Sequence, residues 1–507
     1  MSARERPRGV SVARRLVQAA FLAAFVALAV AAAYPPLSFP ASNVMLRLDP
    51  IAAVYSLISV HSLGVAAAFW PAWVLIGLTA LGSRFFCGWI CPLGTCLDAA
   101  GAVKPRALKY YEPTGSQVRQ LRKGADPAPG TAKHTPPRGR AWLRPKYLLL
   151  ALVLVFALAR VNLLYFASPM VIVNGTVHYA LMPIVPIVFI ALILAAIFYR
   201  PRFWCESLCP SGALLGLVSW AGKKFPSRAG VLAVAKQPSA CTSCGVCYKA
   251  CSFGVEEPFT SEMPGRLRSL DCTSCGQCVG ACPEGALSLD GFGRTLYVAG
   301  AVGARSATDK PSSLPGSPAP PAGRFAVSRR EFLGSVGLGA VLLAGYGIGM
   351  GDHKAPVLRM PGAQDESLFL ARCNRCQECA RACPPGSLKP MGIESGLQKL
   401  WTPRFVPREA GCIFDQCSQA CQRVCPAGAI LKVDPKDTKI GLAALNRRTC
   451  LGWRGKYCLV CQERCRFDAI AAKGLRPSVL EDKCTGCGSC EETCPTNPPS
   501  IVVRPLV

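Results

Sequence analysis

Residues 272–283 read CTSCGQCVGACP, and this stretch decides the fold class of the region around it. Its cysteines follow the spacing C-x2-C-x2-C-x3-C, with Pro283 after the last. At this spacing three thiolates surround one face of a four-iron cubane, and the fourth usually binds the partner cluster. The spacing occurs at four places in the chain: Cys241, Cys244, Cys247 and Cys251; Cys272, Cys275, Cys278 and Cys282; Cys373, Cys376, Cys379 and Cys383; and Cys484, Cys487, Cys490 and Cys494.

Two further groups of four cysteines differ in their first spacings but keep three residues between the third and fourth cysteines. They are Cys412, Cys417, Cys421 and Cys425, before Pro426, and Cys450, Cys458, Cys461 and Cys465, before Arg466. Six groups of four therefore account for 24 of the 29 cysteines and predict six [4Fe–4S] clusters. Disulfides are a poor alternative because a two-residue spacing strains a bridge between neighbours. Zinc would explain one motif but not paired four-cysteine runs, and the chain has only four histidines.

Composition and hydropathy predict a membrane domain before the first cysteine-rich block. Half of the 507 residues are hydrophobic, and four apolar runs have about the length that crosses a bilayer. The alternative is that some runs are buried helices of a soluble protein. The runs cover approximately residues 16–33, 62–82, 147–166 and 179–199.

The positions of the basic residues predict an orientation. Lys and Arg concentrate at the N-terminus and in the loop 83–146, so these parts and the chain after residue 199 are expected in the cytoplasm. The formal charge of +28 also raises the question of nucleic acid. We expect no nucleic-acid partner, because the basic residues lie beside apolar segments and six clusters would remove about 12 positive charges.

The sequence predicts an export signal inside the chain, after the first ferredoxin block. Residues 291–327 are rich in Ala, Gly, Pro and Ser and form a predicted linker, and residues 328–351 open with SRREFLG before an apolar run. A twin arginine in this context indicates a twin-arginine (Tat-type) export signal that also serves as a fifth span. The alternative is a plain fifth helix whose arginines only anchor it. Either way, residues 352–507 are expected in the periplasm of a bacterium, beyond its inner membrane.

The predicted fold is therefore a multi-domain membrane protein with α+β ferredoxin-like domains. A four-helix transmembrane domain (1–235) precedes a cytoplasmic ferredoxin domain with two [4Fe–4S] clusters (236–290). The linker and the fifth span lead to an exported ferredoxin domain with four [4Fe–4S] clusters (352–507).

The five remaining cysteines include an internal repeat. RFFCGWICPLG contains Cys87 and Cys91, and RFWCESLCPSG contains Cys205 and Cys209, so the membrane part is a duplicated two-helix unit. Four thiols meeting there could bind metal, exchange disulfides or contact a quinone, or could be only turn residues. We name them as candidates for a quinol or redox site. Cys96 is unpaired, and His61 and His178 are possible quinol proton acceptors or haem ligands, or interface residues without such a role.

These residues resemble a known pair of proteins. Residues 1–290 resemble NapH, the membrane ferredoxin-type subunit of periplasmic nitrate reductase systems, through the four spans, both C-x3-C-P motifs and the double-cluster block. Residues 326–507 resemble NapG and MauM-type exported ferredoxins, through SRREFLG, DTKIGLAALNRRTCLGWRGKYCLVCQERC and DKCTGCGSCEETCP. Asp415 falls where the family has a cysteine, and Arg466 and Ser252 replace a usual proline. The resemblance implies a fusion of both subunits, with first-to-fourth and second-to-third motif pairing in the exported domain.

The resemblance implies a quinol dehydrogenase-type electron-transfer component. Electrons would pass from membrane quinol through the clusters toward a periplasmic terminal reductase or cytochrome. The expected surroundings are the lipid bilayer and the quinol pool. The alternative is a membrane ferredoxin that supplies electrons for metalloenzyme assembly or maturation.

Overall fold

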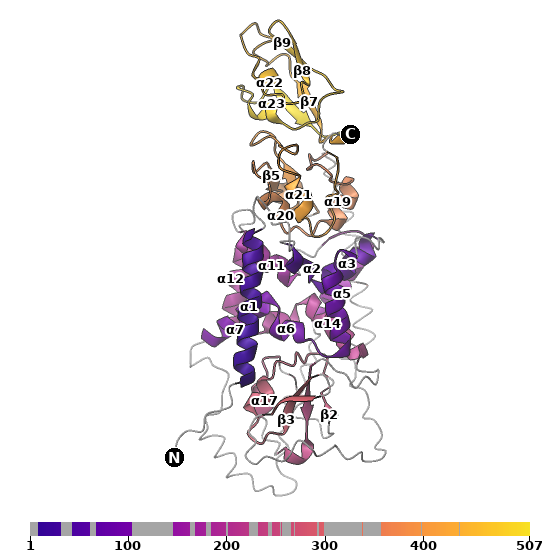
Figure 1. Ribbon diagram of the computed structural model, residues 1–507, viewed down its shortest axis with the longest axis vertical. Helices are drawn as coiled ribbons and strands as arrows, with labels where there is room; N and C mark the ends of the chain where they lie inside the picture. Colours follow the sequence, from indigo (N-terminus) through magenta and orange to yellow (C-terminus); the bar gives the residue numbers. More distant parts are fainter. Residues whose placement is uncertain are drawn as a thin grey trace. The chain divides into compact units, whose positions relative to one another are not determined.

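Figure 1 shows the computed structural model of the chain. The described residues are 9–31, 43–60, 67–103, 145–162, 168–178, 184–198, 201–222, 232–241, 246–253, 255, 265–267, 269–291, 294–298, 337, 356–396, 398–434 and 437–506. The SRREFLG signal, most of the linker and the 83–146 loop, His61 and Cys244 lie outside them. The twin-arginine segment therefore stays a prediction.

The chain divides into two compact units. The first consists of residues 1–24, 73–152 and 190–337, and the second of residues 25–72, 153–189 and 338–507. The predicted cytoplasmic ferredoxin block belongs to the first unit, and the predicted exported block belongs to the second.

Four apolar helices correspond to the predicted spans: α1 (Gly9–Ala31), α5 (Trp70–Leu81), α9 (Pro145–Leu158) and α12 (Ile184–Phe198). Within the described residues, one stretch, Val12–Ala31, is both long and apolar enough to cross a membrane. The other three helices are apolar but shorter. The four-helix transmembrane domain therefore stays a prediction.

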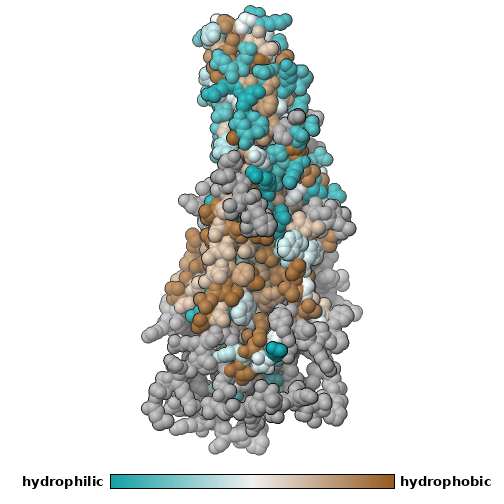
Figure 2. All heavy atoms as spheres, viewed as in Figure 1, coloured by the Kyte–Doolittle hydropathy of each residue, from teal (hydrophilic) through white to brown (hydrophobic). Residues whose placement is uncertain are grey.

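Large apolar side chains are exposed on these helices. Hydrophobic residues gather over the helical part in Figure 2, whereas the C-terminal block is largely hydrophilic. Exposed apolar clusters of this kind mark contact with a protein or a membrane. Examples on α1, α5 and α12 are Leu16, Val30, Trp70, Val74, Leu81, Ile187, Ile190, Leu194 and Phe198.

The C-x3-C-P repeat forms two similar helix pairs in the first unit. α6 (Phe85–Trp89) leads into α7 (Pro92–Val103), and α13 (Phe203–Ser207) leads into α14 (Pro210–Gly222). Each second helix begins at the proline of its motif, since proline has a suitable φ and the first turn needs no N–H from it.

The first unit also contains a four-stranded antiparallel sheet in the order β2-β1-β3-β4. Residues on β3 alternate between buried and partly buried, so one face of the sheet covers a core with Val234, Leu267 and Val279. The elements are β1 (Ala233–Lys236), η2 (Pro238–Ala240), α15 (Val246–Lys249), β2 (Gly265–Arg266), α17 (Gln277–Ala281), β3 (Leu287–Gly291) and β4 (Arg294–Val298).

The second unit contains three short helices, α2 (Val44–Arg47), α3 (Pro50–Val60) and α11 (Pro169–Val177). The sequence patterns did not predict these as separate helices. Ser168 immediately precedes α11, and its Oγ accepts a hydrogen bond from the Val171 N–H at 3.2 Å, while Pro169 occupies the first helical position.

The C-terminal block consists of short helices and three two-stranded sheets, β5-β6, β7-β10 and β8-β9. Gly488 has φ of +82°, and a Cβ there would lie 2.6 Å from Pro407, so the turn after Cys487 requires glycine. The elements are α19 (Glu366–Arg372), α20 (Glu378–Arg381), β5 (Leu388–Pro390), η3 (Ile393–Ser395), β6 (Pro403–Phe405), α21 (Ala420–Val424), β7 (Leu442–Leu445), α22 (Val460–Glu463), β8 (Ile470–Lys473), β9 (Arg476–Val479), α23 (Ser489–Glu492) and β10 (Ile501–Arg504).

Candidate iron–sulfur sites

The first ferredoxin block combines its two motifs. Burial, followed by the nearby thiols of Cys275 and Cys272, raises the pKa of Cys251. Cys278 likewise interacts with Cys275, Cys272 and Cys251. The fourth cysteine of the first motif therefore lies with the first three of the second, as the spacing predicts. The spacing assigns Cys241, Cys244, Cys247 and Cys282 to the partner set, of which Cys244 lies outside the described residues.

Two cavities in the C-terminal block are each lined by four cysteines. One is lined by Cys383, Cys412, Cys417 and Cys421. The other is lined by Cys465, Cys484, Cys487 and Cys490. Each set joins three cysteines of one motif with one of another. Four thiols around a single cavity fit a [4Fe–4S] cluster.

The remaining C-terminal cysteines form two more sets. Cys376 interacts electrostatically with Cys425 and Cys373, and Cys379 with Cys376, Cys373 and Cys425. These four make the third set.

The fourth set contains Cys461, which interacts with Cys450 and Cys458. Cys494 packs in the same core as Cys461 and completes the set. Burial alone would raise the pKa of Cys494, but hydrogen bonds from Thr496 and Ser500 lower it, which favours the thiolate that iron binds.

This grouping corrects the pairing implied by the resemblance. In the C-terminal block, the first motif (Cys373 to Cys383) pairs with the second (Cys412 to Cys425). The third (Cys450 to Cys465) pairs with the fourth (Cys484 to Cys494). The prediction of first-to-fourth and second-to-third pairing was therefore wrong. Cys373, Cys379 and Cys421 share one hydrophobic core, to which Cys487 also contributes, whereas Cys484 and Cys494 belong to another. The two cores are therefore built mainly from motifs close in sequence, and they meet at Cys487.

The two C-terminal cluster pairs are directly joined. The Cys412 N–H donates to the Cys487 carbonyl at 2.7 Å. Arg466 donates to both carboxylate oxygens of Asp415, at 2.8 and 3.0 Å. Asp415 and Arg466 are two positions where the chain departs from the resembled pattern, and they form an ion pair with each other.

Backbone N–H groups point at several thiols. Ala469 donates to the Cys465 Sγ at 3.2 Å, and Ser500 to the Cys494 Sγ at 3.3 Å. Val255 donates to the Cys251 Sγ at 3.4 Å. Hydrogen bonds to the sulfurs are among the features that set cluster potentials, so these contacts also fit cluster ligation.

Polar residues from the helical segments contact the loop of the Cys373 set. Asn162 donates to the Cys373 carbonyl at 2.9 Å, and Asn174 donates to the Cys376 carbonyl at 2.9 Å. The Nε2 of His178 lies 3.3 Å from Glu378, and its Nδ1 lies 3.0 Å from Arg381. His178 is thus part of a buried polar network beside the cluster loop, and the sequence indicated only its position near a helix end.

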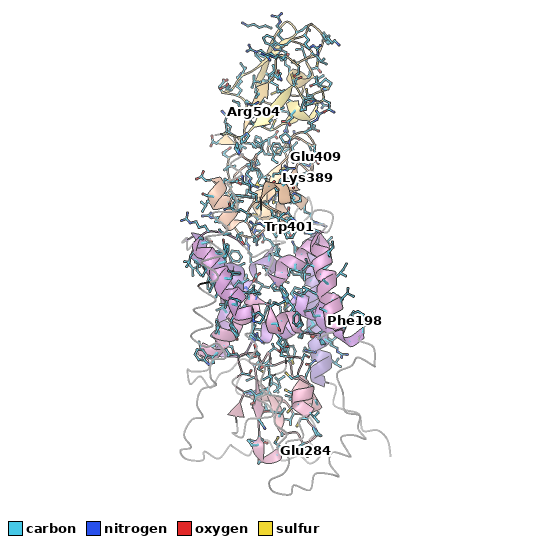
Figure 3. All side chains as sticks on the ribbon, turned by 180° about the vertical axis from the view of Figure 1, so that it is seen from behind. Phe198, Glu284, Lys389, Trp401, Glu409 and Arg504 are labelled. Carbon is cyan, nitrogen blue, oxygen red and sulfur yellow. The ribbon has the colours of Figure 1, made fainter. Side chains whose placement is uncertain are left out.

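The surface of the C-terminal block carries ordinary exposed ion pairs. Lys389 and Glu409 lie beside each other (Figure 3), with 2.9 Å between Nζ and Oε2. Both side chains are 40% exposed or more, so this pair contributes little to stability.

The four cysteines of the C-x3-C-P repeat come together in the first unit. Cys91, Cys205 and Cys209 are buried, and Cys87 is partly exposed. Cys91 interacts electrostatically with the other three, and Cys87 with Cys205. The structure thus places the four thiols near one another, and their role as a quinol or redox site stays a prediction. Cys96 is not among the neighbours of Cys87 and Cys91 in this group.

Arginines from each copy of the repeat contact the other copy. Arg84 donates to the Gly212 carbonyl at 2.7 Å, and Arg202 donates to the Cys87 carbonyl at 2.7 Å. Arg202 also forms an ion pair with Asp98, whose carboxylate is 2.5 Å away. Burial acts to raise the pKa of Asp98, but the charge and hydrogen bonds of Arg202 lower it overall.

The repeat also contacts the first ferredoxin block. Arg84 and Lys146 both pair with Asp271, which precedes the cluster ligand Cys272. The Trp89 Nε1 donates to the Ser274 carbonyl at 3.1 Å, between two ligands of the same cluster. The four-thiol group and this cluster loop therefore belong to one packed structure.

Comparison with protein families identifies several iron–sulfur domains. A 4Fe-4S dicluster domain matches residues 240–287, and 4Fe-4S binding domains match residues 370–391 and 477–500. A further 4Fe-4S binding domain matches residues 63–109 and 181–228, one C-x3-C-P motif in each. The chain therefore contains multiple [4Fe–4S] ferredoxin domains, and the total of six clusters stays a prediction.

Curated relatives include ferredoxin-type proteins. The chain is 36% identical over 203 residues to the ferredoxin-type protein NapG of Escherichia coli, covering 35% of this chain and 86% of NapG. It is 39% identical over 201 residues to the methylamine utilization ferredoxin-type protein MauM of Methylorubrum extorquens, covering 35% and 89%. The ferredoxin-type protein NapF of Escherichia coli is 28% identical over 146 residues, covering 28% and 81%. No solved structure shows significant similarity.

Proposed function

Because the chain belongs to the family of NapG- and MauM-type ferredoxin proteins, we propose that it carries electrons from membrane quinol through [4Fe–4S] clusters toward an exported reductase. The system would be of the nitrate-reductase type, as the resemblance of residues 1–290 to NapH and of residues 326–507 to NapG implies. The reaction at each cluster is one-electron transfer, and the thiolates hold the iron without making or breaking substrate bonds.

The contact between helical segments and the Cys373 loop carries this proposal. Asn162 and Asn174 follow or belong to apolar segments, yet their amides donate to carbonyls of Cys373 and Cys376. Buried polar groups need such partners, so the helical segments and the cluster loop stabilise each other. This arrangement would let electrons from a donor at the helices reach the C-terminal clusters directly.

A linear order of clusters in the C-terminal block follows from the contacts within it. The Cys373 set and the Cys383 set share one core. The Cys412–Cys487 backbone hydrogen bond then links the Cys383 set to the Cys465 set, and Cys461 and Cys465 share the last core. Electrons would enter at the Cys373 set and leave from the Cys450 set.

The membrane arrangement and the fusion are part of the same proposal. Residues 1–290 would act as a NapH-type membrane subunit and the C-terminal part as its NapG-type partner. The division of the chain supports this: the helix ends expected in the cytoplasm belong to the unit of the first ferredoxin block, and the opposite ends to the unit of the second. The exposed apolar side chains on α1, α5 and α12 would face lipid.

The test is anoxic reduction of the purified full chain in mild detergent. A quinol analogue should produce low-temperature EPR signals of reduced cubanes within seconds. Dithionite gives the total reducible signal as a control. Clusters that dithionite reduces but quinol leaves oxidised would overturn the quinol step and favour a role in metalloenzyme assembly.

A further inference from the structure

We propose that Cys87, Cys91, Cys205 and Cys209 hold one additional [4Fe–4S] cluster, shared between the two copies of the C-x3-C-P repeat. Each copy supplies two thiols, so neither copy completes a four-ligand site alone. The cluster would be a seventh in the chain and would exchange electrons with the first ferredoxin block.

The first observation is that the two copies are interlaced around the thiols. The Arg202 guanidinium reaches the Cys87 carbonyl and lies 3.8 Å from the Cys205 Sγ, so it touches both copies. In the other direction, Arg84 bonds the Gly212 carbonyl. The glycine in each C-P-x-G turn permits this approach: a Cβ on Gly94 would lie 2.5 Å from the Arg202 Nη1.

The second observation is an excess of buried positive charge around the thiols. Arg84, Lys146 and Arg202 are at most 1% exposed in their side chains and all act electrostatically on Cys87. With Arg14, which pairs with Asp98, there are four cations and two carboxylates, Asp98 and Asp271, leaving 4 − 2 = +2. Buried charge requires compensation, and a cubane with four thiolates carries about −2.

The third observation is that the sulfurs accept backbone hydrogen bonds. The Gly212 N–H donates to the Cys209 Sγ at 3.3 Å. Gly94 makes the corresponding backbone hydrogen bond to Cys91 in the other copy. The same N–H-to-sulfur contact occurs at Cys465 and Cys494 in the ferredoxin sets. The repeat thus has the sulfur environment of the recognised cluster ligands.

The family comparison favours a cluster over a single metal ion. The 4Fe-4S binding domain that matches residues 63–109 and 181–228 contains one copy of the repeat in each segment. Four thiols, two from each copy, are the ligand number that one [4Fe–4S] cluster requires.

The position of the site gives it a redox partner. Arg84 and Arg202 both stack on the ring of Phe253, at 5.7 and 5.2 Å, and Phe253 is two residues after the ligand Cys251. A Cβ on Gly88 would lie 3.1 Å from the Thr273 carbonyl, next to the ligand Cys272. One electron would pass between the shared cluster and the cluster of Cys251, Cys272, Cys275 and Cys278, with one oxidised as the other is reduced.

The test is iron and sulfide content of the full chain, purified without oxygen. Seven clusters give about 28 irons and 28 sulfides per chain. The double variant Cys91→Ala/Cys209→Ala should lose about four of each, whereas the matched control Cys96→Ala on α7 should lose none. This readout does not depend on the electron donor, so it separates this inference from failure of the quinol proposal.

Thiol labelling of the unmodified chain provides a second measurement, which does not depend on whether the cysteine variants fold. In the unmodified chain, these four cysteines should resist alkylation until a chelator removes iron, whereas alkylation of Cys96 should be the same with and without chelator. A disulfide between any two of the four, one zinc per chain at this site, or unchanged iron in the double variant would each overturn the shared cluster.

Discussion

The side-chain amide of Asn174 lies 2.9 Å from a carboxylate oxygen of Glu378, 204 positions further along the chain. The same amide donates to the Cys376 carbonyl, two residues before Glu378. One side chain on α11 therefore holds two groups of a loop that supplies cluster ligands. His178 adds a contact to the same carboxylate, so this end of α11 is fixed to the loop.

Asn174→Ala should loosen the Cys373 cluster. The substitution leaves the Glu378 carboxylate and a backbone carbonyl short of a donor in a buried place, which costs about 1–3 kcal/mol. We expect faster release of iron to a chelator from this one cluster, measured by its absorbance and EPR signal. Thr176→Val is the matched control, because the Thr176 hydroxyl on the same helix donates to the Ile172 carbonyl, within the helix itself. Equal iron release from both variants would contradict a role of Asn174 at the loop.

The sequence could predict the cysteine sets but not this contact. Iron ligation dictates cysteine spacing, so Cys376 and Cys379 were identifiable from the motif alone. Nothing in the pattern distinguishes Asn174 from any polar residue in an apolar segment, since its partner is distant in the chain. Motif pairing was also hidden, because motifs of the same spacing are interchangeable until the chain folds.

Asp271 should be essential for the packing of the first unit. Asp271→Asn removes the carboxylate that pairs with both Arg84 and Lys146. Removing one partner of a buried ion pair costs about 3–5 kcal/mol, so we expect a clearly lower thermal midpoint for the detergent-solubilised chain. Glu409→Gln is the control, because its exposed pair with Lys389 contributes about 0–1 kcal/mol. Similar midpoints for both variants would contradict the buried network.

The double arginine in SRREFLG should control export of the C-terminal block. Arg329→Lys/Arg330→Lys should leave residues 352–507 in the cytoplasm, because twin-arginine transport requires both arginines. A reporter active only outside the cytoplasm, fused after Val507, should lose most of its activity. Normal reporter activity in the double variant would show that the arginines are only a membrane anchor. Activity of a cytoplasm-specific reporter in the unchanged chain would reverse the topology.

The pairing of the C-terminal motifs can be decided by counting lost iron in double variants. In the structure, Cys383 and Cys417 line the same cavity, so Cys383→Ala/Cys417→Ala should remove one cluster, about four irons. Cys487 lines the other cavity, so Cys383→Ala/Cys487→Ala should remove two clusters, about eight irons. Iron and sulfide analysis of the anoxically purified chain provides the measurement.

First-to-fourth pairing would reverse these two results. Cys383 and Cys487 would then bind the same cluster, and their double variant would lose the smaller amount of iron. The two variants share the Cys383 substitution and differ only in the second cysteine, so each is the control for the other. Loss of all iron in both would instead show that the cores around Cys421 and Cys494 fold as one unit, because the Cys412–Cys487 backbone hydrogen bond joins them.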